Sequence, residues 1–165
     1  MAFPVNSAVY GQNIISSLAA PTTAAMAITG AGRMYVALYT DSTFSQVPTG
    51  GSTAGYSTTS EHTSSGTPGA DGYGYTPGGA ALAGMALTMS SGLLVYTANI
   101  LTWTAVVLSN VRGCVIYDNV ATFPVAKPCL AAVRFSGLGS SGGGDFTIDW
   151  SNTPSTNTIF TIDPA

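Results

Sequence analysis

The single histidine, His62, is the first residue to weigh for chemistry. It follows Glu61 in the polar stretch S-T-T-S-E-H-T-S-S, where a Ser–His–acid site can be imagined. Serines occur throughout the chain, however, and no G-x-S-x-G elbow accompanies them. A lone histidine without a partner pattern predicts a solvated loop residue. One histidine and two distant cysteines do not form the ligand set of a structural zinc site.

Asp145 and Asp149 are four residues apart on an expected strand, so they share one face. Paired carboxylates can serve hydrolysis, but one of them must then lie in a cleft with a raised pKa. Calcium needs about six to eight oxygen ligands. The sequence shows neither arrangement. We therefore expect a solvent-facing polar row that keeps an edge strand from pairing with other chains.

The segment Gly137–Gly144, G-L-G-S-S-G-G-G, is superficially like a phosphate loop. It lacks the lysine and the following helix of a P-loop. We expect a flexible hairpin connection between strands. The sequence thus predicts no catalytic residue, no metal site and no cofactor.

Arg112 and Arg134 each lie inside an apolar stretch. An arginine in such a place points outward or is held by a carboxylate. Asp118 and Asp149 are available partners. An ion pair between subunits and an ion pair within the chain both remain open, with the second favoured.

Charged side chains are scarce. Four Lys and Arg and seven Asp and Glu make up 7% of the 165 residues, against about 25% in an ordinary soluble domain. A weakly charged surface repels other copies weakly, so association is easy. This composition is typical of chains that work in a large assembly or outside the cell.

The same composition excludes several classes of partner. A net charge of −3 with four scattered cations does not provide the basic face that nucleic acid requires. The apolar runs are far shorter than the roughly 20 residues of a membrane helix. The N-terminus, M-A-F-P-V-N-S, lacks the features of a signal peptide. We expect synthesis in the cytosol without Sec export, and therefore two free thiols at Cys114 and Cys129 rather than a disulfide.

Short apolar segments separated by turn residues predict an all-β domain over residues 31–165, an antiparallel β-sandwich or jelly roll. The stretch Ile100–Asp118 reads as its central, buried hairpin, turning near Ser109 and Asn110. Asp145, Thr147 and Asp149 alternate with apolar residues, which indicates a half-buried antiparallel strand. The expected strands are 34–40, 80–89, 92–97, 99–107, 111–118, 129–136, 145–150 and 158–163.

Residues 1–30 precede this domain. Ser7 or Asn6 could cap a short helix that stops before Pro21. The same composition suits an arm that crosses to a neighbouring subunit. A helix packed on the sheet and an arm both remain open.

The Gly/Ser/Thr-rich stretch 49–80 holds nine of the 20 glycines and predicts a long loop. Such a loop in a compact domain is usually functional or flexible. Tyr56, Tyr73 and Tyr75 stand among small polar residues, as in adaptable contact surfaces. We expect an interface here, with a flexible solvent loop as the alternative.

The order of several motifs resembles small β-sheet structural proteins of tailed bacteriophages. In these proteins a Y-x-A-L-Y-T strand comes first, and a pair of strands with W and R-G-a-V-I-Y-d follows. The pattern ends with F-x-I-x-W/F and then I-F-x-I. The likeness covers residues 34–163, but not 1–30 or 57–79. The matching segments are M-Y-V-A-L-Y-T at 34–40, G-Y at 55–56, L-T-W at 101–103, N-V-R-G-C-V-I-Y-D at 110–118, L-A-A-V-R-F at 130–135 and D-F-T-I-D-W at 145–150.

The resemblance implies a non-enzymatic virion component, assembled in the host cytoplasm. A single domain without a repetitive shaft favours a head decoration, or cement, protein over a trimeric fibre. Its partners would be the major capsid protein and copies of itself, and it would stabilise the shell by bridging capsid subunits. A tail, adaptor or fibre component that binds other tail proteins, or a host-receptor-binding module, remains open. The expected interface residues are Tyr56, Tyr73, Tyr75, Arg112 and Arg134.

Overall fold

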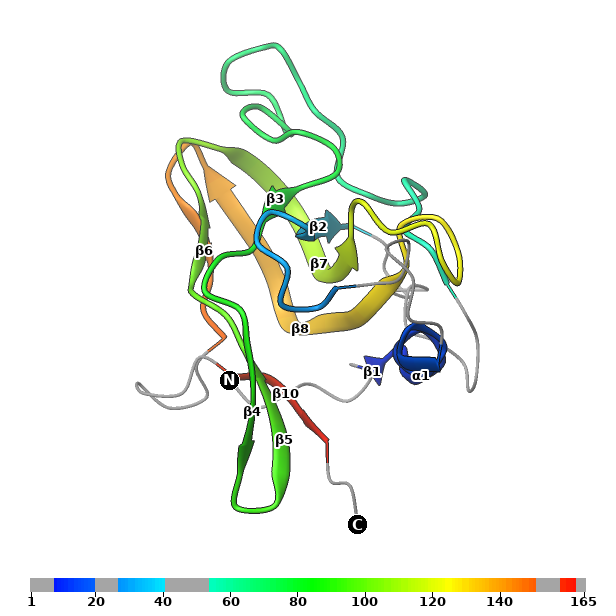
Figure 1. Ribbon diagram of the computed structural model, residues 1–165. Helices are drawn as coiled ribbons and strands as arrows, with labels where there is room; N and C mark the ends of the chain where they lie inside the picture. Colours follow the sequence, from blue (N-terminus) through cyan, green and yellow to red (C-terminus); the bar gives the residue numbers. More distant parts are fainter. Residues whose placement is uncertain (1–7, 20–26, 41–53, 151–157, 163–165) are drawn as a thin grey trace.

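A computed structural model describes residues 8–19, 27–40, 54–150 and 158–162 (Figure 1). These residues form one helix and ten strands, and every pairing between the strands is antiparallel. The all-β antiparallel class is therefore confirmed. The elements are β1 (Ala8–Val9), α1 (Gly11–Ala19), β2 (Met34–Tyr39), β3 (Ala80–Ala81), β4 (Ala86–Ser90), β5 (Leu93–Thr97), β6 (Leu101–Trp103), β7 (Val107–Asp118), β8 (Cys129–Gly142), β9 (Phe146–Ile148) and β10 (Thr158–Ile162).

The largest sheet has the strand order β1-β8-β7-β2-β3. Its centre is the long antiparallel pair β7–β8, which runs from Val107 opposite Gly142 to Tyr117 opposite Cys129. Strand β2 pairs with β7 along its whole length, whereas β1 pairs with β8 only at Ala131 and Ala132. The outer edge of β8 beyond Ala132 is consequently unpaired among the described strands.

Two smaller sheets complete the described strands, one with the order β10-β5-β4 and one formed by β6 and β9. Figure 1 shows β4 and β5 as a hairpin that extends away from the large sheet, with β10 beside β5. This division into three sheets does not confirm the narrower expectation of a two-sheet sandwich or a jelly roll.

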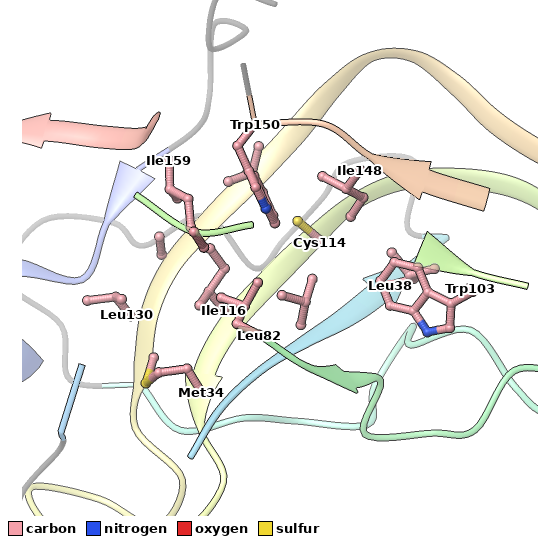
Figure 2. Close-up of a cluster of buried hydrophobic side chains, with 14 of the residues drawn as sticks. Met34, Leu38, Leu82, Trp103, Cys114, Ile116, Leu130, Ile148, Trp150 and Ile159 are labelled. Atoms are coloured by element: carbon pink, nitrogen blue, oxygen red, sulfur yellow. The ribbon is translucent and has the colours of Figure 1, made fainter. Parts of the chain in front are cut away.

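The central strands are buried on both faces. Along β2, Met34, Val36 and Leu38 contact one cluster of apolar side chains, while Tyr35, Ala37 and Tyr39 contact a second cluster. Because successive side chains of a strand point to opposite faces, the two clusters lie on opposite sides of the sheet. Figure 2 shows the larger cluster, in which Trp103, Ile148, Trp150 and Ile159 pack over the central strands.

The expectation of a hairpin over Ile100–Asp118 is wrong. Strand β6 pairs with β9, and β7 pairs with β2 and β8. Strand β6 ends at Trp103 because Ala105 has a φ of +51°, which a continuing strand does not allow. Asn110, expected in a turn, has a φ of +56° and forms an irregularity inside β7.

The glycine segment 137–144 also differs from its expected role as a hairpin connection. Strand β8 continues through it to Gly142, so only Gly143, Gly144 and Asp145 lie between β8 and β9. Small residues suit this part of the strand, because a Cβ on Gly139 would lie 2.8 Å from the ring of Phe146. The glycines therefore let an aromatic ring lie directly against the backbone of β8.

At the N-terminal side, α1 is the helix that the sequence left open as one of two alternatives. Ile14 packs against the larger cluster, and the Asn13 side-chain amide donates to the carbonyls of Ala54 and Cys129, each at 2.8 Å. A helix capped at Asn6 or Ser7 would include Val9, which lies in β1 instead. The expected caps Asn6 and Ser7 lie outside the described residues. No helix among the described ranges is long and apolar enough to cross a membrane.

Cys114 and Cys129 are free thiols, as expected, and both are buried. They contact different apolar clusters and so lie on opposite faces of the sheet. Burial raises the pKa of the Cys129 thiol to about 12 and that of Cys114 further. Both side chains therefore behave as small apolar core residues.

A buried carboxylate closes one end of the β7–β8 pair. Asp118 has no exposed surface and forms an ion pair with Arg33 at 2.8 Å. Its oxygens also accept hydrogen bonds from the backbone N–H groups of Ala27, Val120 and Ala121 at 2.9–3.0 Å. The expectation that Asp118 pairs with Arg112 or Arg134 is thus corrected, since its acceptor positions are filled by the segment before β2 and the loop after β7.

Replacing Asp118 with alanine should destabilise the fold by about 3 kcal/mol. The change removes the partner of Arg33 and leaves three backbone donors without an acceptor. Urea denaturation measures the effect. As a control, Asp145→Asn changes an exposed carboxylate and should alter stability by less than about 0.5 kcal/mol. Equal midpoints for the two variants would contradict this assignment.

Candidate functional site

The described part of the expected loop, residues 54–80, packs closely against the large sheet. Glu61 forms an isolated bridge with Tyr39, and the N–H of His62 donates to the carbonyl of Leu38 at 2.8 Å. Gly79 has a φ of +72°, and a Cβ there would lie 1.7 Å from the Val36 oxygen. Only glycine allows this approach. Residues 54–80, here called the cover segment, therefore pack against the sheet, unlike the flexible solvent loop of the alternative expectation.

Two tyrosines of this segment form hydrogen bonds with Glu61. Glu61 is 6% exposed. Its carboxylate accepts hydrogen bonds from the hydroxyls of Tyr56 and Tyr75, the latter at 2.8 Å, and from the N–H of Gly78 at 2.6 Å. The Tyr75 hydroxyl also accepts from the Leu38 N–H at 3.0 Å. Burial, the largest cause, raises the pKa of Tyr75 far above its ordinary range, although the hydrogen bond from Leu38 opposes the rise.

The three tyrosines expected at an interface therefore differ in accessibility. Tyr75 is 2% exposed and contacts other parts of this chain. Tyr56 is half-buried, stacks on Tyr117 with ring centroids 4.3 Å apart, and lies under the ammonium of Lys127. Tyr73 is also half-buried. All three side chains belong to the segment that packs against the sheet. Tyr56 and Tyr75 both donate hydrogen bonds to Glu61, whereas Tyr73 does not.

His62 is buried, and the expectation of a solvated loop histidine is wrong. The residue is 3% exposed. Its Nδ1 lies 3.2 Å from the Thr63 carbonyl, and its Nε2 lies 3.3 Å from the Ser109 carbonyl and 3.2 Å from Asp71. Sequence reasoning missed this position because the surrounding serines and threonines are polar, while the apolar contact comes from Tyr75, 5.7 Å away between ring centroids.

These groups do not form a catalytic constellation. The Ser109 hydroxyl donates to Asp71 at 2.7 Å, so the serine and the histidine both face the same carboxylate. A nucleophilic serine must instead donate to the histidine. The contacts of Asp71 with His62 and Ser109 attach the segment to β7.

Asp145 and Asp149 face solvent, in agreement with the expected polar row. Asp145 accepts a hydrogen bond from the Ala105 N–H at 3.3 Å. Within the described ranges, no group of three or more His, Cys, Asp or Glu side chains is arranged to hold a metal ion.

The two arginines of the expected interface occupy different settings. Arg112 is half-buried in β7, and its Nε has no hydrogen-bond partner among the described residues. Arg134 is half-buried in β8 and lines a groove beside that strand. The structure does not bring either arginine to Tyr56, Tyr73 or Tyr75 through any contact that it records.

A groove lies beside Arg134. It has a volume of about 340 Å³, within the roughly 300–1,000 Å³ of ligand pockets. Apart from Arg134 and Asp149, every residue of its lining is uncharged. The lining comprises Val133, Arg134, Phe135, Ser136, Gly137, Leu138, Gly139, Phe146, Thr147, Ile148, Asp149, Trp150 and Thr158.

The pairing of the strands explains why the groove exists. Among the described residues, β1 pairs with β8 only at Ala131 and Ala132, and β9 pairs with β6 instead of with β8. Phe146 packs against Gly139 and near Phe135, with ring centroids 6.5 Å apart, which forms an aromatic floor. The alternation of glycine with larger residues after Arg134 was the available signal, but the sequence pattern alone suggested a loop there.

Comparison with known proteins adds no relative. No protein-family model matches the chain, and no curated protein or solved structure matches it.

Removing the Tyr75 hydroxyl tests the buried cluster. Tyr75→Phe leaves the Leu38 N–H without its acceptor and takes a donor from Glu61, which should cost about 1–3 kcal/mol. Tyr73→Phe makes the same chemical change on the half-buried neighbour, where we expect less than about 0.5 kcal/mol. Urea denaturation of both variants provides the comparison. An equal loss in the two would show that Glu61 does not depend on Tyr75.

Proposed function

We propose that this chain is a non-enzymatic structural protein of a tailed-bacteriophage virion, and specifically a head decoration protein. It binds the major capsid protein and copies of itself and stabilises the shell by bridging capsid subunits. The single observation that carries the binding role is the apolar groove along β8. The virion assignment is supported by the order of the sequence motifs and by the 7% content of charged residues.

The groove suits an extended segment of a neighbouring protein. The outer edge of β8 beyond Ala132 pairs with no described strand, so its backbone groups can bond an added strand. Phe135, Ile148 and Trp150 offer apolar contacts along the same groove. Main-chain hydrogen bonds supply affinity in this mode of binding, and the apolar contacts select the side chains of the added segment.

A non-enzymatic role agrees with the use of the polar side chains. Glu61 and His62 contact groups of this chain, and Asp71 joins His62 to Ser109. The apolar groove holds no paired carboxylates and no histidine. Its chemistry is suited to burying apolar surface.

Binding to empty phage heads tests this proposal. Leu138 lines the groove and is 53% exposed, so Leu138→Asp should fold normally. Because it places a charge where apolar surface must be buried, we expect at least about a tenfold loss of affinity. Val120→Asp is the matched control, since Val120 is 60% exposed and outside the groove lining.

The measurement is cosedimentation of each purified variant with heads that lack the protein. The wild type and Val120→Asp should bind, and Leu138→Asp should not. Equal binding of all three proteins would exclude the groove, and no binding of the wild type would exclude a decoration role. Binding to purified tails instead of heads would favour the alternative of a tail or adaptor component.

A further inference from the structure

Strand β4 presents an open edge. In the three-stranded sheet β10-β5-β4, β4 is the last strand, and no described strand pairs with its outer side. Its hairpin with β5 extends away from the large sheet (Figure 1). An open strand edge is a template for pairing with another chain.

The edge of β4 lacks the features that usually prevent such pairing. Monomeric proteins protect edges with lysine, proline, bulges or inward-pointing charges. Residues 86–90, A-L-T-M-S, contain no charge and no proline, and all five pair with β5 without a register shift. No charged residue occurs between Asp71 and Arg112. The hairpin therefore carries no charge that would repel the same hairpin of a second copy.

The turn determines which backbone groups face outward. Ser91 and Gly92 both have positive φ, +50° and +82°, as in a two-residue type I′ turn. The flanking residues Ser90 and Leu93 are then a hydrogen-bonded pair. Since the ladder alternates, the N–H and C=O groups of Leu87 and Met89 point away from β5.

The side chains of the same two residues form an exposed apolar row. Leu87 is opposite Tyr96, and Met89 is opposite Leu94, so these four side chains share one face. Tyr96 is fully buried at the base of the hairpin, where it stacks on Phe160 with ring centroids 5.1 Å apart. Leu87 and Met89 are 37% and 62% exposed, so the apolar face continues outward to the open edge.

We propose that two copies of this chain join edge to edge through β4, antiparallel, around a two-fold axis that passes Thr88. In this register Leu87 of each copy is opposite Met89 of the other, and Ala86 is opposite Ser90. The outward backbone groups of Leu87 and Met89 then bond each other. The sheets merge into one with the order β10-β5-β4-β4-β5-β10, and the exposed apolar row is shared between the copies.

Other registers fit less well. A shift of one residue places Leu87 opposite Thr88, which mixes the apolar and polar faces. The outward backbone groups of Leu87 would then face Thr88, whose own backbone groups point toward β5. An axis at Met89 places the turn residue Ser91 opposite Leu87, outside the strand. Only the axis at Thr88 pairs all five residues of β4 with all five of its copy. Such an isologous contact closes on itself as a dimer.

Disulfide trapping tests the register. In a pair without backbone hydrogen bonds the two Thr88 Cα atoms lie about 4.5 Å apart, within the roughly 4.4–6.8 Å of disulfides. Thr88→Cys should therefore cross-link under mild oxidation. Ser90→Cys on the same strand is the control, because two copies of that position lie about 14 Å apart in the proposed register. The native thiols are buried and should not react.

Sedimentation equilibrium tests the contact without a cross-link. The wild type should be a dimer, and Met89→Lys should weaken it at least tenfold. Ile100→Lys, at a position 51% exposed and outside β4, should leave the dimer intact. A monomeric wild type, equal cross-linking of the two cysteine variants, or a dimer that tolerates Met89→Lys would each overturn the proposal.

This inference deepens the proposed function, on which it rests for its biological meaning, by identifying the surface that joins two copies. The two can fail separately. Dimerisation by the wild type without binding to heads removes the decoration role and leaves the β4 contact in place. If a monomeric wild type binds to heads, the β4 contact is excluded and the decoration role is left in place.

Discussion

The antiparallel pairing of β7 with β8 is the interaction on which the other elements depend. Strands β2 and β1 are added to its two sides, and the cover segment 54–80 is fastened to it through Asp71 and Ser109. The ion pair of Asp118 with Arg33 closes one end, and the apolar groove lies along the other. Because both faces of its centre are buried, the part of this pair that we propose for binding is the outer edge of β8.

A low content of charge shapes the rest of the molecule. The few carboxylates that are buried, Glu61 and Asp118, each organise several backbone or hydroxyl donors, so they act as internal anchors. Elsewhere charges are few: β4 carries none, and β8 carries only Arg134, so both edges have little electrostatic protection. We propose different partners for these two edges: an extended segment of a neighbouring protein for β8, and a second copy of this chain for β4.

The sequence was sufficient for the fold class and for most strands, because alternation and turn residues are local signals. It was insufficient where backbone angles or distant contacts decide the outcome. The positive φ of Ala105 ends β6, where the sequence predicted a strand over 99–107. Gly139 allows β8 to continue beneath Phe146, where the sequence predicted a hairpin connection. His62 is buried by residues far along the chain. The groove depends on how strands distant in the sequence pair with each other, which no local sequence pattern predicts.

The central claim is that this chain is a building component of a phage head. Quantitative mass spectrometry of purified particles, scaled to the major capsid protein, tests it most directly. We expect the chain in hundreds of copies per particle, because a decoration protein repeats with the capsid lattice. Three to about a dozen copies would place it in the tail instead, and its absence from purified particles would contradict the account.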